Sequence, residues 1–409
     1  MPRMLYTLSE KNLHLGVFES MWQALREAVA AEGWTIERVD PHAPEFWWKL
    51  MDYAQDPEAV INFGNHVYDL HLSGENLFRF KPLTEFFACR MVASIGDHPF
   101  MPSMMVRLRC ASSGLRFQGA VPGFGPAMRI CQVHPPSFTL IDPVVSYGAQ
   151  AQQQPFDARP IDLLIGLNVV TCKTLSLLRA YFPQRGSPER RLIEGAYDAL
   201  RQDRENYPLT VANAVVQSIF GHSMEDNAVE FSRRVDLARF ICDVDLVVRR
   251  ERREEILQGL LRDTAGLRVM MIDGGFPEEL SGPHVDVVPR VPASKFGELL
   301  GQSKVSLHVH PTYPGGLHER MVNTMAAGAA LLTDPTPALR RWTENQDYAL
   351  VHPGETLRQV VERVGAPQFA PIAAAGPPRA DREFSAAAHA RRLIALATEA
   401  EPPTQLLAA

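Results

Sequence analysis

The chain has 409 residues, which is long enough for two or three domains, each with a hydrophobic core. Hydrophobic residues make up 46% and charged residues 22%, as is typical of globular proteins. The net charge of −6 offers nucleic acid no general attraction. No apolar run is long enough for a transmembrane segment, so we expect none.

The cysteines predict neither a disulfide framework nor a zinc ribbon. They are odd in number, scattered, and never spaced as CxxC. The N-terminal residues also lack the continuous apolar core of a secretory signal, so we expect a cytoplasmic protein. The five cysteines are Cys89, Cys110, Cys131, Cys172 and Cys242.

The first part of the chain alternates between helical and strand patterns. Apolar residues recur at helical spacing over 18–32, and short apolar runs at 34–36, 59–63 and 90–95 predict strands. Polar or glycine-containing residues follow the later strands, which is typical of an open α/β sheet. The Gln- and Pro-containing stretch 142–160 is the best candidate for a linker.

A second α/β domain is predicted from the buried strand at 161–166. About 100 residues of helical pattern follow, over about 171–265, which is more than a simple crossover needs. We expect a helical insertion that contacts an acceptor, contacts a second subunit in a homo-oligomer, or adds packing. Its arginine-rich run at 249–253 is either a solvated helix face or a contact for phosphate or an anionic membrane.

Strand patterns resume after the insertion, at 267–272, and the chain closes with a tail. Residues 365–381 are rich in proline and alanine and are predicted to be extended, while 384–398 predict an amphipathic helix. The predicted divisions are a first domain over 1–150, a second over 151–370, and a tail over 371–409, with its helix packed back on the first domain.

The most informative segment covers 305–334. A buried strand ends near His310, and Gly315 and Gly316 allow close backbone approach to a ligand. A helix is then predicted to begin near His318, where free N–H groups and the helix dipole favour an anion. Loops of this kind, at the carboxyl end of a parallel strand, commonly hold phosphates in α/β proteins.

This segment resembles the C-terminal signature of GT-B glycosyltransferases, particularly the spore-maturation-protein (CgeB-like) branch. The specific overlap covers about thirty residues, with looser similarity over roughly 160–350. The resemblance implies two doubly wound, Rossmann-like α/β domains facing across a cleft, with the helical insertion in the second. The matching residues are Gly316, His318, Glu319, Arg320, Ala326, Gly328, Thr333 and Asp334.

The resemblance implies a donor site for a nucleotide-diphosphate sugar in the second domain and an acceptor side in the first. Gly315 and Asn323 stand where retaining relatives carry a pair of glutamates, so no retaining mechanism carries over. The predicted donor-binding residues are Gly166, Asn168, His310, Gly315, Gly316, His318, Glu319, Arg320 and Asn323.

His308, His310 and His318 also suggest a metal site. Thiols and carboxylates at ligand spacing are missing around them, apart from Glu319, so we predict no metal and no cofactor. His310 and His318 are expected to bind phosphate or sugar hydroxyls, and His308 to be a satisfied core histidine.

Catalysis is assigned to Asp97 and His98, which follow the strand pattern ending at Ile95. Relatives of the CgeB-like type often carry Asp-His-Pro at a similar place. Asp97 is the predicted general base, with His98 as the competing candidate. The alternative is that Asp97 only caps a turn before Pro99.

These observations predict a metal-independent glycosyltransferase of the hexosyltransferase type (EC 2.4). Its partners are a nucleotide sugar and an acceptor, whether glycan, protein or small molecule, that the sequence does not specify. One alternative is a nucleotide-sugar epimerase or hydrolase on the same fold. The other is a non-catalytic binding or scaffold subunit, which the missing glutamate pair motivates.

Overall fold

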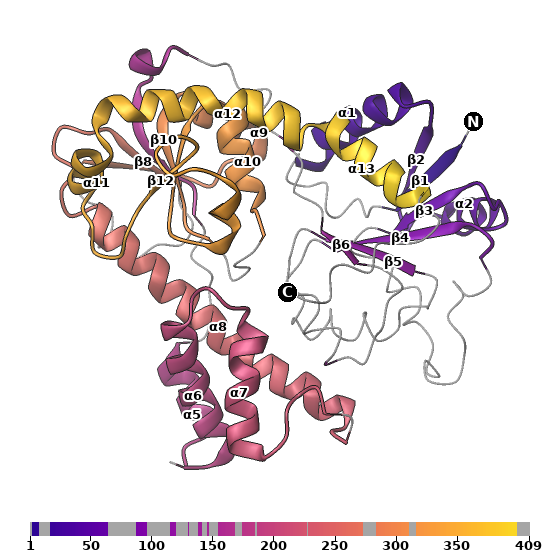
Figure 1. Ribbon diagram of the computed structural model, residues 1–409, viewed down its shortest axis with the longest axis horizontal. Helices are drawn as coiled ribbons and strands as arrows, with labels where there is room; N and C mark the ends of the chain where they lie inside the picture. The colour runs from indigo at the N-terminus through magenta and orange to yellow at the C-terminus, as the bar shows by residue number, and fades with distance from the viewer. Residues whose placement is uncertain are drawn as a thin grey trace. The chain divides into compact units, whose positions relative to one another are not determined.

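The computed structural model describes residues 2–7, 17–63, 87–95, 115–119, 130, 138–140, 145–146, 154–167, 174–184, 186–226, 228–272, 284–310 and 316–398. The chain divides into two compact units, each built on a parallel sheet with helices (Figure 1). The first unit comprises Met1–Asp142, His222–Arg239 and Ala386–Ala409. The second comprises Pro143–Gly221 and Phe240–Ser385.

Among the described residues, the sheet of the first unit has six strands in the order β2-β1-β3-β4-β5-β6, all parallel. The predicted strands at 59–63 and 90–95 are confirmed, whereas β1 was not predicted. The elements are β1 (Arg3–Thr7), α1 (Val17–Ala31), β2 (Thr35–Val39), α2 (Phe46–Ala54), β3 (Val60–Phe63), β4 (Arg90–Ile95), β5 (Leu115–Gly119), β6 (Phe138–Leu140) and α13 (Ala386–Thr398).

The C-terminal helix α13 packs against α1 within this unit, although more than 350 residues separate them along the chain. Leu393 and Ala397 share a buried cluster with Leu25 and Val29. Arg90 on β4 donates a 2.7 Å hydrogen bond to the carbonyl of Ala397. The first unit therefore uses sequence from the very end of the described chain to complete its core.

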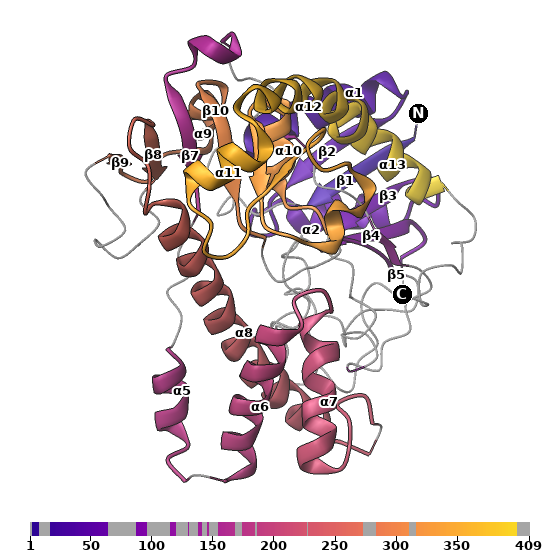
Figure 2. The same ribbon diagram turned by 60° about the vertical axis from the view of Figure 1, so that its left-hand side comes forward.

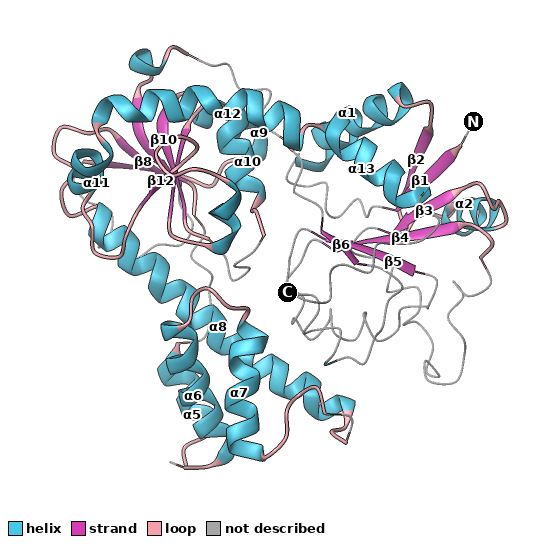
Figure 3. Ribbon diagram, viewed as in Figure 1, coloured by secondary structure: helices cyan, strands magenta, loops and turns pink. Residues whose placement is uncertain are grey.

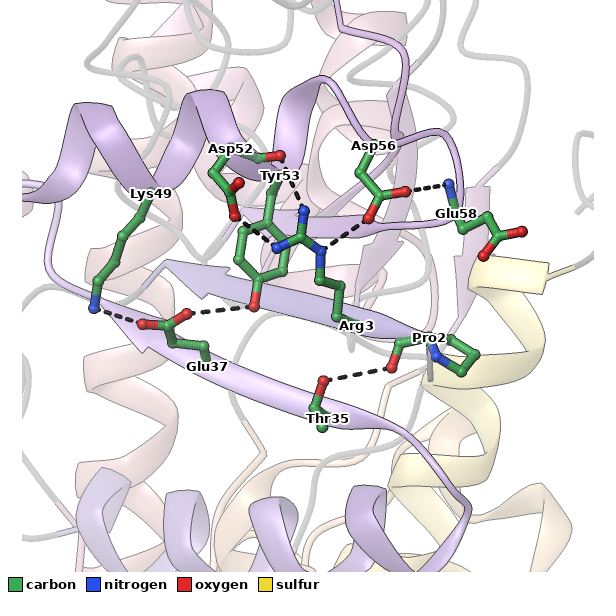
Figure 4. A network of polar contacts seen from close by, with 9 residues as sticks. All are labelled: Pro2, Arg3, Thr35, Glu37, Lys49, Asp52, Tyr53, Asp56 and Glu58. Atoms are coloured by element: carbon green, nitrogen blue, oxygen red, sulfur yellow. Dashed lines mark hydrogen bonds and ion pairs between the residues drawn. The ribbon is translucent and has the colours of Figure 1, made fainter.

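A polar network joins β1, β2 and α2 at the surface of this unit (Figure 4). Arg3 forms ion pairs with Asp52 at 2.6 Å and Asp56 at 2.8 Å, and the hydrogen bond from Arg3 lowers the pKa of Asp56. The Tyr53 hydroxyl donates to Glu37 at 3.3 Å. Burial and that carboxylate raise the pKa of Tyr53 to about 12, so the phenol stays a donor at neutral pH.

The described part of the second unit contains six parallel strands in the order β12-β11-β10-β7-β8-β9. The order reverses between β7 and β10, so their carboxyl ends form the topological switch point of the sheet. The elements here are β7 (Ile161–Ile165), β8 (Val269–Ile272), β9 (Val285–Val288), α9 (Ala293–Gly301), β10 (Ser303–His308), α10 (Glu319–Ala326), β11 (Ala330–Thr333), β12 (Ala349–Leu350), α11 (Leu357–Val364) and α12 (Phe369–Phe384).

The helical insertion between β7 and β8 consists of α5 (Leu175–Tyr181), α6 (Pro188–Gln202), α7 (Pro208–Phe220) and α8 (Phe231–Leu260). The C-terminal end of α8 packs on the sheet core through Ile256, Leu257 and Leu260. Nearer its middle, Val244 and Val247 pack on α5 and α6 instead. The second unit thus carries α5–α7 along α8, beyond the sheet (Figures 2 and 3).

The prediction that residues 365–381 are extended is wrong, because most of them form α12. Pro377 and Pro378 lie inside this helix, and each removes a backbone donor. Burial of one apolar face against α10 and the sheet offsets that loss. Gly376 permits the approach, since a Cβ there would lie 2.6 Å from the Met325 carbonyl oxygen.

None of the helices in the described residues is both long and apolar enough to cross a membrane.

Candidate functional site

The carboxyl ends of β7 and β10 hold the residues predicted to bind the donor. Gly166 directly follows β7, and a Cβ at this position would lie 2.5 Å from the ring of Phe296 on α9. The glycine is therefore needed for this aromatic ring to pack over the strand end. On β10, the strand that pairs with β7, His308 is the last residue, and His310 follows two residues after the strand ends.

His310 connects the end of β10 to Gly316, which lies two residues before the N-cap of α10. Its backbone N–H donates to the Asp334 carboxylate at 2.7 Å. Its ring Nε2 lies 2.7 Å from the Gly316 carbonyl, which can only accept, so Nε2 carries the proton. His310 was predicted to bind phosphate or sugar hydroxyls, but its Nε2 atom is occupied within the protein. His310 positions the loop, and only 4% of its surface is exposed.

Helix α10 begins with His318 as its N-cap. The Nδ1 atom of His318 accepts a hydrogen bond from the backbone N–H of Arg320 at 3.2 Å, so the proton lies on Nε2. Glu319 occupies the first turn and is exposed. The sequence therefore predicted the start of this helix correctly, and the helix dipole makes this end positive.

Three histidines cluster behind this helix end. The ring of His308 lies 5.0 Å from that of His318 and 5.8 Å from that of His310. Burial lowers the pKa of His308 and His318 well below the usual range, and the positive charges of Arg320 and Arg253 lower both further. Both imidazoles are therefore neutral at physiological pH.

His308 is buried, as predicted, but it is not satisfied. Neither of its ring nitrogens has a hydrogen-bond partner among the described residues. Within that same part of the chain, no three His, Cys, Asp or Glu side chains are grouped as a metal ion requires.

The guanidinium of Arg320 forms no ion pair or hydrogen bond with any described side chain. Its backbone N–H is held by His318, which fixes the first turn of α10. The charge of Arg320 also contributes to the low pKa of His318, so the two side chains are close. An arginine that lies beside a positive helix end and has no partner in the described part of the chain is suited to bind an anion.

Asn323 does not reach the surface. It is fully buried, accepts a 3.0 Å hydrogen bond from the Ser146 backbone, and donates a 2.8 Å bond to the Glu319 carbonyl. These contacts connect α10 to residues 145–146. The side chain predicted to bind the donor therefore positions the helix, and with 0% exposure it presents no atom to a ligand.

The arginine run at 249–253 on α8 is not a solvated helix face, so that predicted alternative is wrong. Arg252 forms a buried ion pair with Asp334, and its side chain is 16% exposed. Arg253 is 7% exposed. Arg250, on another side of the helix, instead pairs with Glu254 at 2.7 Å. Spacing explains the difference, because residues 249, 252 and 253 share one helix face.

Arginines of the helical insertion line two neighbouring hollows in the second unit. The smaller has a volume of about 50 Å³ and is bounded by Arg204, Arg249 and Arg252, with His310 at the strand end. The larger has a volume of about 360 Å³ and shares Arg204 and Arg252, with Asp334. Basic side chains from the insertion therefore adjoin the carboxyl edge of β10 and β11.

The predicted donor-binding residues include none from the insertion. A phosphate contact was one of the roles predicted for the run at 249–253, and the spacing of Arg249, Arg252 and Arg253 along α8 is the signal that favours it. Arg204 was not predicted. Four other predicted site residues lie outside the described residues. They are Asp97, His98, Asn168 and Gly315.

Comparison with solved structures identifies the fold. A DNA-modifying β-glucosyltransferase, studied with and without uridine diphosphoglucose, is 10% identical over 97% of this chain and 99% of its own, with a TM-score of 0.51. T4 phage BGT bound to UDP-glucose is 9% identical, over 98% of this chain and 100% of its own, with a TM-score of 0.49. Sucrose-phosphate synthase from Thermosynechococcus elongatus is 11% identical, over 97% of this chain and 98% of its own, with a TM-score of 0.47.

The chain therefore has the GT-B fold of glycosyltransferases, and the predicted fold class is confirmed. Residues 249–395 match the family model described as glycosyl transferase-like. This match includes the α8 arginines, β10, α10 and Asp334. A search of the curated proteins finds no match to the sequence.

Proposed function

We propose that this protein transfers a sugar from a nucleotide-diphosphate donor to an acceptor. The observation that carries the proposal is the start of α10, where Arg320 and the neutral His318 lie at the switch point of a GT-B sheet. The matching family model covers this same segment. A uridine diphosphate sugar is the first donor to test, because the β-glucosyltransferase of the same fold was studied with one.

The site can stabilise a leaving nucleoside diphosphate without help from a carboxylate-bound metal. The helix dipole at the start of α10 favours the developing negative charge. Arg320 adds a charge-assisted hydrogen bond, and the Nε2–H of His318 adds a neutral donor. Asp97, or His98 as the competitor, is proposed to accept the acceptor proton.

Arg320→Ala is expected to weaken donor binding by about 1.5–3 kcal/mol, the range for a lost charge-assisted contact. Calorimetric titration with UDP measures the change. Arg358→Ala is the matched control, since Arg358 also belongs to the second unit but pairs with Asp263 at an exposed position. Equal affinities in wild type and a folded Arg320→Ala variant would remove Arg320 from the donor site.

Turnover is expected to persist in EDTA. The proposed leaving-group contacts are the positive end of α10 and cationic or neutral side chains, and none of them needs a divalent ion. The measurement is donor turnover before and after chelation, followed by addition of magnesium or manganese. Loss of activity in EDTA with recovery on adding metal would contradict this account.

A second function has one observation in its favour. Retaining relatives carry a glutamate pair where this chain has Gly315 and Asn323, and Asn323 is buried in a positioning role. The missing pair favours a non-catalytic binding or scaffold subunit.

The alternatives differ in what they do to the donor. A non-catalytic binding subunit would hold nucleotide without consuming donor. An epimerase or hydrolase would change the donor sugar with no acceptor present, whereas a transferase needs an acceptor for efficient turnover.

The finer assignments remain part of this proposal. They are the hexosyl specificity, the CgeB-like branch, the cytoplasmic location and an acceptor side in the first unit. Each depends on the resemblance of the segment 305–334 and on the composition of the chain.

A further inference from the structure

We propose that Arg249 of the helical insertion binds a phosphate of the donor, so that α8 forms one wall of the donor site. The inference rests on the proposed function for the identity of the ligand. The residue itself is singled out by its position and by its lack of a partner among the described residues.

Arg249 is the arginine of this helix turn that no described residue neutralises. Arg250 pairs with Glu254, and Arg252 pairs with Asp334. Arg249 forms no ion pair or hydrogen bond with any described residue, and its Nε is shielded from solvent without a partner. A guanidinium nitrogen that is shielded from solvent without a partner costs free energy, and a bound anion would offset part of that cost.

Arg249 lies close to the carboxyl end of β10. It lines the smaller hollow together with Arg204 and His310. Its charge also helps to lower the pKa of His318, so it acts on the start of α10. Arg249 and Arg320 thus approach one region from two different elements, as would suit the two phosphates of a diphosphate.

Two acidic residues also line this hollow, and neither neutralises Arg249. The Asp203 carboxylate accepts hydrogen bonds from the backbone and the side chain of Asn206. Asp245 lies one helical turn before Arg249 on α8 and is 2% exposed, but no ion pair joins the two. Three arginines, Arg204, Arg249 and Arg252, face these two aspartates in the lining, so the lining side chains carry an excess of one positive charge.

Arg204 strengthens the basic character of the hollow. Burial lowers the pKa of Arg204, and the positive charge of Arg252 lowers it further. Its ion pair with Glu255 is long, at 3.8 Å. The insertion therefore does more than add packing, since it places cations beside the loop that the family signature identifies.

The test compares wild type, Arg249→Gln and Arg250→Gln by calorimetric titration. The probes are UDP, inorganic pyrophosphate, uridine and glucose 6-phosphate. Arg250→Gln is the matched control, because it removes the same charge from the adjacent position without touching the hollow. Circular dichroism and thermal unfolding confirm that each variant is folded.

Arg249→Gln is expected to weaken UDP and pyrophosphate binding by about 10- to 150-fold, the range for one charge-assisted contact. Uridine binding should not change, and Arg250→Gln should stay within about twofold of wild type. The dependence of UDP affinity on salt should also be smaller in Arg249→Gln, since one charge contact is lost.

Unchanged UDP and pyrophosphate affinity in Arg249→Gln would overturn the inference, as would a wild type that binds neither. A loss confined to glucose 6-phosphate would assign the phosphate to another substrate and overturn the donor assignment. If pyrophosphate binding depends on Arg249 while no nucleotide sugar binds or turns over, the proposed function fails and the phosphate site stands.

Discussion

Asp334→Ala is expected to lower the free energy of unfolding by about 3–5 kcal/mol, the range for breaking a buried ion pair. Asp334 is fully buried and neutralises Arg252 of α8. It also accepts the backbone N–H of His310. Removing the carboxylate therefore leaves a largely buried guanidinium without its counter-charge and a buried amide without an acceptor, at the same sheet edge.

Urea unfolding of the isolated variant measures this change. Asp334→Asn should lose less stability than Asp334→Ala, because an amide oxygen can still accept from His310. Asp263→Ala breaks the exposed pair with Arg358 and should cost much less than either. If Asp334→Ala were no more destabilising than Asp263→Ala, the connection between α8 and β11 would contribute little.

Asp97→Asn is expected to reduce the transfer rate by roughly 10²–10⁴-fold, the loss associated with a general base. The substitution keeps the size of the side chain and removes its charge, so folding and donor affinity should survive. Turnover and UDP affinity are measured on the same preparation.

Three outcomes separate the roles of Asp97. Loss of turnover with intact UDP binding supports the general base. Near-normal turnover would contradict it and direct attention to His98. Loss of folding would indicate that Asp97 caps the turn before Pro99.

Much of the fold could be predicted because buried strands and helix ends have local signals. The apolar run at 161–166 forms β7, and the predicted helix start at His318 is the N-cap of α10. The prediction for α12 failed because Pro377 and Pro378 argue locally against a helix. Close packing through Gly376 supplies tertiary stabilisation, which sequence pattern does not report.

The candidate site was predicted only in part, because side-chain roles depend on contacts between distant segments. The signature identified Arg320 and His318, but it could not show that Asn323 holds Ser146, 177 positions away. It also could not show that Arg252 pairs with Asp334. The spacing of Arg249, Arg252 and Arg253 along α8 can be read from the sequence. Their proximity to the carboxyl ends of β10 and β11 cannot.

The most direct test is a donor-turnover assay with a panel of nucleotide sugars, UDP-glucose included. Purified protein is incubated with each donor, with and without a panel of acceptors, and both nucleoside diphosphate and sugar products are quantified. We expect an acceptor to stimulate the release of nucleoside diphosphate and a glycosylated product to form, and we expect Arg320→Ala to show much less donor turnover. Tight nucleotide binding with no donor consumed under any condition would contradict the assignment as a glycosyltransferase.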